Sequence, residues 1–105
     1  MGIERRREVR TVVNIPVLVT ELDPPGQAPR SGVLKDVSKN GMLVRISHAM
    51  PSGALLKVAT PDMLTLGEVV RCLPDGDGFD VALALRHSLD GAIDSILSFV
   101  NRSVA

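Results

Sequence analysis

Two groups of residues in this sequence have side chains suited to recognising a small anionic ligand. The first is the run Arg5-Arg6-Arg7-Glu8-Val9-Arg10, in which Arg6 and Arg10 have the spacing Arg-x-x-x-Arg. A guanidinium can donate two parallel hydrogen bonds to a phosphate, or to O6 and N7 of a guanine. The run therefore predicts contact with a phosphate or a guanine, although a basic segment of this kind is more often a solvated arm.

The second group is Asp36-Val37-Ser38-Lys39-Asn40-Gly41, which has the pattern Asp-x-Ser-x-x-Gly. An ionised Asp36 can accept hydrogen bonds from the N–H groups of a guanine edge, and Ser38 adds a short donor and acceptor. Gly41 lets the backbone turn and approach a ligand without a Cβ in the way. The same pattern is typical of a plain turn between strands, so the interpretation as a site depends on both groups occurring together.

Composition argues against several other classes of function. The 105 residues carry 12 basic and 12 acidic side chains, and this zero net charge does not favour a nucleic-acid polymer as partner. With two Phe and no Tyr or Trp, the chain also lacks stacking platforms for single strands. His48, His87 and Cys72 fall in no catalytic or metal-binding motif, so we expect no enzyme activity, no metal and no cofactor.

The residues after Arg10 form short runs in which apolar and polar side chains alternate, the pattern of β-strands separated by turns. In the first run Val13, Ile15, Val17 and Val19 share one face, while Pro16 on the other face is tolerated best at an edge. Arg45 is expected to be a solvent-facing strand residue. Further strands are predicted near 31–37, 42–47, 55–58, 66–73 and 79–85, and Asp75-Gly76-Asp77-Gly78 reads as a hairpin connection.

After residue 88 the apolar residues no longer alternate with polar ones. Its apolar residues recur at steps of three and four and predict an amphipathic helix over 88–104, with Ser88 as N-cap; they are Leu89, Ile93, Ile96, Leu97, Val100 and Val104. Because such a helix is marginal alone in water, we expect it to pack on the strands or on a partner subunit.

The two motifs, in this order and on this background of six strands, resemble the PilZ family of cyclic di-GMP receptors over almost the whole chain. The resemblance implies an all-β fold with one C-terminal helix, a six-stranded antiparallel PilZ-type β-barrel over residues 12–105, preceded by a flexible arginine-rich arm over 1–11. In the family both motifs contact the nucleotide, and these roles carry over to Arg6, Arg10, Asp36, Ser38 and Gly41.

Three further arginines are weaker candidates for the same ligand. Arg5 and Arg7 could reach a second ligand molecule, and Arg71 lies near where relatives often have a large side chain that could stack on a guanine. An ordinary solvated strand residue is an equal alternative for Arg71. The segment Val81-Ala82-Leu83-Ala84-Leu85 departs from the Gly-Val-x-Phe with which relatives often end the last strand, so details of barrel packing are expected to differ.

The resemblance implies a non-catalytic receptor for cyclic di-GMP whose arm becomes ordered on the ligand and signals to an effector protein that the sequence does not identify. The alternative is a PilZ-like protein-interaction module that does not bind nucleotide. We expect a cytoplasmic protein, either monomer or dimer, without membrane insertion, because no apolar run approaches the ~20 residues needed to cross a bilayer.

Overall fold

The computed structural model describes residues 9–85, so the predicted helix over 88–104 and the arginines Arg5, Arg6 and Arg7 lie outside the described residues. The described part contains six strands: β1 Thr11–Glu21, β2 Arg30–Val37, β3 Gly41–Ile46, β4 Leu55–Ala59, β5 Leu64–Asp75 and β6 Gly78–Leu85. Each strand that the alternating pattern predicts is therefore present. β1 begins at Thr11, the last residue of the predicted arm.

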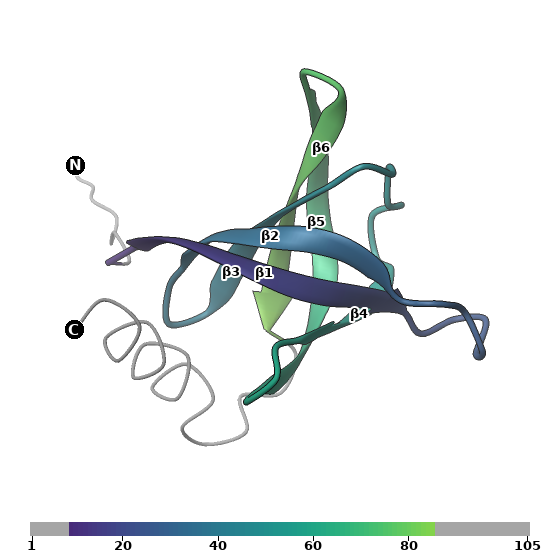
Figure 1. Cartoon of the computed structure of the whole chain (residues 1–105). Coiled ribbons are helices and arrows are strands. Elements are labelled where there is room, and N and C mark those ends of the chain that lie inside the picture. Colours follow the sequence, from purple (N-terminus) through teal and green to yellow (C-terminus); the bar gives the residue numbers. More distant parts are fainter. Residues whose placement is uncertain (1–8, 86–105) are drawn as a thin grey trace, which may run out of the picture.

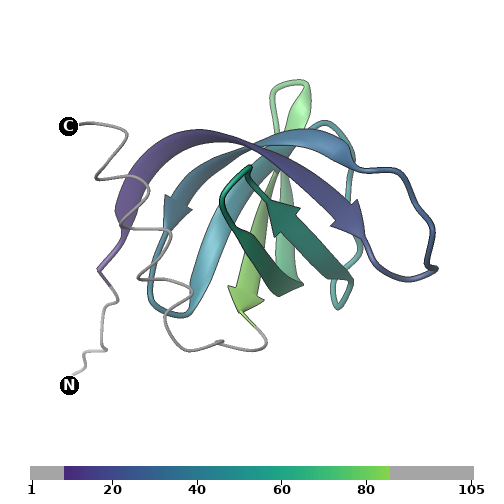
Figure 2. The ribbon, with the colours of Figure 1, turned by 60° about the horizontal axis from the view of Figure 1, so that its bottom comes forward.

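The strands pair antiparallel and close into a barrel in the order β1-β2-β3-β6-β5-β4 (Figures 1 and 2). This confirms the predicted six-stranded antiparallel barrel. The closing contact is short, since β1 pairs with β4 from Leu18 to Glu21, opposite Leu56–Ala59. The β5–β6 hairpin projects beyond the rest of the barrel, past the end of β4 (Figure 1).

Alternation places the apolar faces of the strands inside the barrel, as the sequence predicts. Val17 and Val19 of β1 are buried, and Val13 and Ile15 pack against the core as partly buried residues. The whole buried apolar set is Val17, Val19, Leu34, Val37, Met42, Val44, Ile46, Met50, Leu56, Val58, Val69, Val81 and Leu83.

Pro16 lies in the half of β1 that, among the described residues, pairs with β2 alone. The Leu22 N–H donates to the Leu55 oxygen, and alternate residues of a strand direct their backbone groups to the same side. Pro16 therefore faces the β4 side, beyond the end of β4. The expectation that Pro16 occupies an edge holds locally, although the barrel as a whole is closed.

The connection between β5 and β6 is the predicted hairpin, and its turn has two residues between the paired ends. Asp75 pairs with Gly78, and Gly76 has a φ of 62°. Tight hairpin turns require a positive φ at the first central residue, where glycine is favoured because it has no Cβ.

Candidate functional site

Arg10 and Asp36, one from each predicted motif, are joined by an ion pair. The Arg10 Nη1 atom donates to Asp36 Oδ1 at 2.9 Å. Thr11 starts β1 directly after Arg10, and Val12 pairs with Asp36 across β1 and β2, so the strand register holds the two side chains side by side. The Arg10 side chain is 58% exposed and that of Asp36 is 19% exposed. The two motifs therefore meet on the outside of the barrel, where a ligand can reach them.

A β-bulge brings Asp36 to the outer face. Leu34 is buried, so strict alternation would direct Asp36 inward as well, but the β2–β3 register shifts between Leu34 and Asp36. The shift leaves Lys35 as an extra residue, turns Asp36 outward and returns the next residue, Val37, to the core.

A second bulge does the same for Arg71. The inward residues of β5 are Thr65, Gly67 and Val69, and continued alternation would place Arg71 inside the barrel. The β5–β6 register shifts between Val69 and Arg71, which makes Val70 the extra residue. As a result Arg71 is exposed, while Cys72 packs against the core.

Asp36 and Arg71 then stand at the two ends of one row across the outer face. Asp36 pairs with Leu43, Leu43 with Ala82, and Ala82 with Arg71. Leu43 lies between buried residues of β3, and Ala82 between buried residues of β6, so both side chains point outward. Three strand spacings separate the ends of the row, roughly 14 Å along the surface. We call Asp36, Leu43, Ala82 and Arg71 the outer row.

Ser38 and Gly41 shape the turn that follows Asp36. The Ser38 side chain is buried, and both its N–H and its hydroxyl donate to the Gly41 carbonyl oxygen, at 2.9 and 3.4 Å. The φ of Gly41 is not positive, so the turn does not explain the glycine. A Cβ at Gly41 would lie 2.7 Å from the Leu83 carbonyl oxygen, and the glycine therefore permits β3 to approach β6 closely. A contact of Ser38 or Gly41 with a ligand stays a prediction.

Arg45 lies on the outer face, as expected, but it is partly buried there because it is paired with residues at the turn of the β5–β6 hairpin. Its Nη1 donates to Asp75 Oδ2 and its Nη2 to the Asp75 carbonyl oxygen, both at 2.7 Å. Asp77 and Asp80 lie at 3.6 and 3.5 Å from the same guanidinium. Arg45 thus ties the hairpin to β3 and balances the negative charge of Asp75, Asp77 and Asp80.

Asp36 and Arg71, the two ends of the outer row, were predicted from the sequence as ligand-binding residues, whereas the two residues between them were not. Leu43 and Ala82 are ordinary strand residues in the sequence, and no motif marks them; only the register across three strands shows that they separate Asp36 from Arg71. Arg5, Arg6 and Arg7 lie outside the described residues, so their relation to the row is not described.

Two other kinds of site are absent from the described part of the chain. Residues 9–85 contain no group of three or more His, Cys, Asp or Glu side chains placed to hold a metal ion. No helix within the same residues has the length and apolarity to span a membrane.

The described residues thus form a small antiparallel β-barrel module with an arginine–carboxylate pair and a second arginine on one outer face. The sequence profile described as "PilZ domain" matches residues 4–102, and the chain belongs to the PilZ family. No curated protein sequence matches the chain well enough to count as a relative.

Among solved structures, the chain is similar to the Bacillus subtilis inhibitor of motility, MotI/DgrA, with a TM-score of 0.68 and 19% sequence identity. The match covers 97% of this chain and 52% of that protein, so the chain spans about half the length of this structural relative. A likeness at this identity supports the barrel fold.

Proposed function

We propose that this PilZ chain is a non-catalytic receptor for cyclic di-GMP. The observation that carries the proposal is the ion pair between Arg10 and Asp36, which unites the two predicted motifs at one end of the outer row. Arg71 stands exposed at the other end. Strand register and two bulges maintain this spacing, so the groups are positioned before any ligand arrives.

Each group on the outer row suits one part of the dinucleotide. Asp36 accepts hydrogen bonds from the N–H groups of a guanine edge, which an ionised carboxylate does well. Arg10 has five N–H donors and spends one on Asp36, so it can still donate to a guanine or a phosphate. Arg71 offers a planar cation that can stack on the second guanine. Between Asp36 and Arg71, Leu43 and Ala82 form an apolar surface on which the nucleotide can lie.

The remaining parts of the proposal concern the arm and the partner. Arg5, Arg6 and Arg7 add phosphate contacts, the arm over 1–11 becomes ordered across the bound nucleotide, and the ordered arm presents a new surface to an effector protein in the cytoplasm. This is a population shift with a disorder-to-order element. Hydrogen exchange tests it: protection of residues 2–10 should rise when cyclic di-GMP is added, and unchanged exchange in the arm contradicts this mechanism.

Isothermal titration with cyclic di-GMP tests binding itself. We expect heat with cyclic di-GMP and little heat with cyclic di-AMP, whose adenines lack the O6 acceptor and the N1–H donor of guanine. Asp36→Asn and Arg71→Ala should each weaken binding, because they remove opposite ends of the same row. A silent titration at high protein concentration contradicts the proposal and leaves the alternative, an interaction module that does not bind nucleotide.

A further inference from the structure

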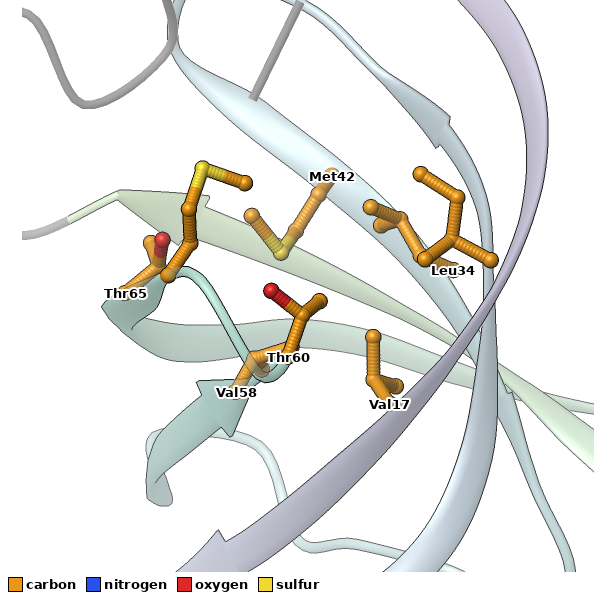
Figure 3. A pocket seen from close by; sticks show the side chains of 8 residues that line it. Val17, Leu34, Met42, Val58, Thr60 and Thr65 are labelled. Carbon is orange, nitrogen blue, oxygen red and sulfur yellow. The ribbon is translucent and has the colours of Figure 1, made fainter. Parts of the chain in front are cut away.

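The outer face of β1, β4 and β5 carries a group of exposed leucines. Figure 3 shows Val17, Val58 and Thr65, one from each of these strands, lining a recess inside the barrel. Because successive side chains of a strand alternate between its two faces, the residues next to inward ones point outward. The leucines that do so on these strands are each between 38% and 57% exposed: Leu18, Leu55, Leu64 and Leu66.

Strand register gathers the four leucines around one lysine. Lys57 of β4 pairs directly with Leu66 of β5. In the next row across the strands, Leu18 of β1 and Leu64 of β5 pair with the same residue of β4, so they stand on either side of that strand. Leu55 precedes Lys57 by two residues and shares its face of β4. We call the four leucines, with Lys57 among them, the leucine face.

Lys57 brings an unpaired positive charge to the middle of the leucine face. Within residues 9–85 the ion pairs are formed by Arg10 and Arg45, and Lys57 takes part in none of them. Lys57 is half-buried, as expected when an aliphatic stem lies on apolar neighbours and the ammonium group reaches the surface. Any molecule that covers the leucines also removes water from this ammonium group, which is unfavourable unless the molecule supplies an anion there.

We propose that the leucine face binds an amphipathic helix of another protein, with a carboxylate in the middle of the apolar stripe of that helix. The face extends across three strands, which is two strand spacings or roughly 10 Å, and a helix is about 10–12 Å in diameter. A helix laid on the face of a sheet is one of the common ways in which two layers pack. The carboxylate would pair with the Lys57 ammonium group.

A second copy of this chain fits the leucine face less well. A two-fold contact centred on the face would bring the Lys57 side chains of both molecules together, and like charges across an interface oppose association. A stable interface also buries about 800 Å² on each partner, and four leucines that are about half exposed supply less than half of that area. The face therefore suits a small partner segment that binds reversibly.

The leucine face is separate from the outer row. In the closed order of strands, β4 lies three strands away from β3 in either direction around the barrel. Lys57 of β4 is at the centre of the leucine face, whereas Leu43 of β3 lies within the outer row. A partner helix and a nucleotide would thus occupy opposite sides of the barrel, and this inference does not depend on nucleotide binding.

Two synthetic peptides test the proposed chemistry on the full chain. Both are amphipathic helices with leucines at steps of three and four; one has a glutamate and the other a lysine in the middle of the apolar stripe. At up to about 1 mM, the glutamate peptide should shift backbone amide NMR signals of the leucine face and bind on the order of tenfold more tightly than the lysine peptide. The proposal is overturned if no signal shifts or if the shifts map to other strands.

Reversing the charge of Lys57 should reverse the choice of peptide. In Lys57→Glu the lysine peptide should bind more tightly than the glutamate peptide, because the repulsive pair has become the attractive one. The matched control is Lys39→Glu, which makes the same change of charge at an exposed position of the β2–β3 turn and should keep the original preference. An unchanged preference in a folded Lys57→Glu chain, or a reversed one in Lys39→Glu, rules out the assigned role of Lys57.

Leu64→Asn combined with Leu66→Asn distinguishes a partner helix from other occupants of the face. Both leucines are exposed, so circular dichroism should show an intact barrel, while binding of the glutamate peptide should be lost. Light scattering of the chain alone detects self-association, and sedimentation with vesicles of phosphatidylcholine and phosphatidylglycerol detects membrane binding. If the unsubstituted chain dimerises or binds vesicles and the double substitution prevents it, the face belongs to a second copy or to a membrane, and the proposal fails.

Discussion

Asp36 and Arg71 are related by the same structural device: each directly follows a β-bulge that turns its side chain from the barrel interior to the surface. A one-residue shift reverses the face of every residue that follows it in a strand. Without the two bulges, both charged groups would point into the aliphatic core, where an unpaired charge is strongly destabilising. The bulges therefore create the outer row and also allow the core to remain apolar.

Arg10→Ala should weaken binding of cyclic di-GMP by roughly 10- to 100-fold, since loss of a charged hydrogen bond costs about 1.5–3 kcal/mol. Because Arg10 is largely exposed, the free energy of unfolding should change by less than about 1 kcal/mol. Titration calorimetry and urea unfolding measure the two quantities. Arg30→Ala, at the far end of β2, is the matched control and should bind normally. Strong destabilisation by Arg10→Ala with normal binding points instead to a structural role for Arg10.

Ala82→Trp should abolish most binding while leaving the barrel folded. Ala82 lies between Leu43 and Arg71 with its side chain outward, so an indole would fill the floor of the outer row without entering the core. The control is Ala59→Trp, which adds the same indole to the outer face of β4, away from the row. Full affinity in a folded Ala82→Trp chain places the ligand elsewhere on the molecule.

Gly41→Ala should destabilise the barrel by about 1–3 kcal/mol, because its Cβ would meet the Leu83 carbonyl oxygen at 2.7 Å. Gly67→Ala is the graded comparison, since its Cβ would come no closer than 3.2 Å to another atom and requires a smaller adjustment. Urea unfolding of both variants should rank Gly41→Ala as the less stable. The opposite ranking shows that the β3–β6 approach tolerates a side chain and that another reason favours glycine at position 41.

Arg45→Met should loosen the β5–β6 hairpin. The change removes two hydrogen bonds to Asp75 and leaves three carboxylates together, one of which, Asp80, has a buried Oδ1 without a hydrogen-bond partner. A loss of about 1–3 kcal/mol in unfolding free energy is expected. Adding Asp80→Asn should recover part of it, because the change relieves like-charge repulsion. Faster hydrogen exchange confined to residues 73–80 locates the effect, and an unaltered hairpin contradicts it.

Much of the fold follows from alternation in the sequence. Val13, Ile15, Val17 and Val19 face inward as predicted, and the strand boundaries agree because Pro, Gly and Asp punctuate the runs. The bulges were not predictable, since β5 reads Glu68-Val69-Val70-Arg71-Cys72 and either valine satisfies an apolar position. Because the sequence does not show which of the two valines faces the core, it does not show whether the Arg71 side chain points inward or outward.

The candidate site was predictable from the sequence at its two ends but not in its middle. Arg10 and Asp36 belong to motifs, whereas Leu43 and Ala82 acquire their place from pairings between strands far apart in the sequence. The ion pairs of Arg45 were not predicted for the same reason, because its partners Asp75 and Asp80 are supplied by a hairpin thirty or more residues away. The pairing of charges between distant segments depends on how the strands are aligned in the folded barrel, and no local sequence pattern indicates it.

Pro16 also has a consequence for association between molecules. Among the described residues, the N-terminal half of β1 has no strand partner on the side of β4, and an unpaired strand edge of this kind can pair with a strand of a neighbouring chain. The backbone nitrogen of Pro16 carries no hydrogen, so it cannot donate a hydrogen bond to such an added strand. Within residues 9–85, the incomplete seam of the barrel is therefore protected by Pro16 against pairing with a strand of another chain.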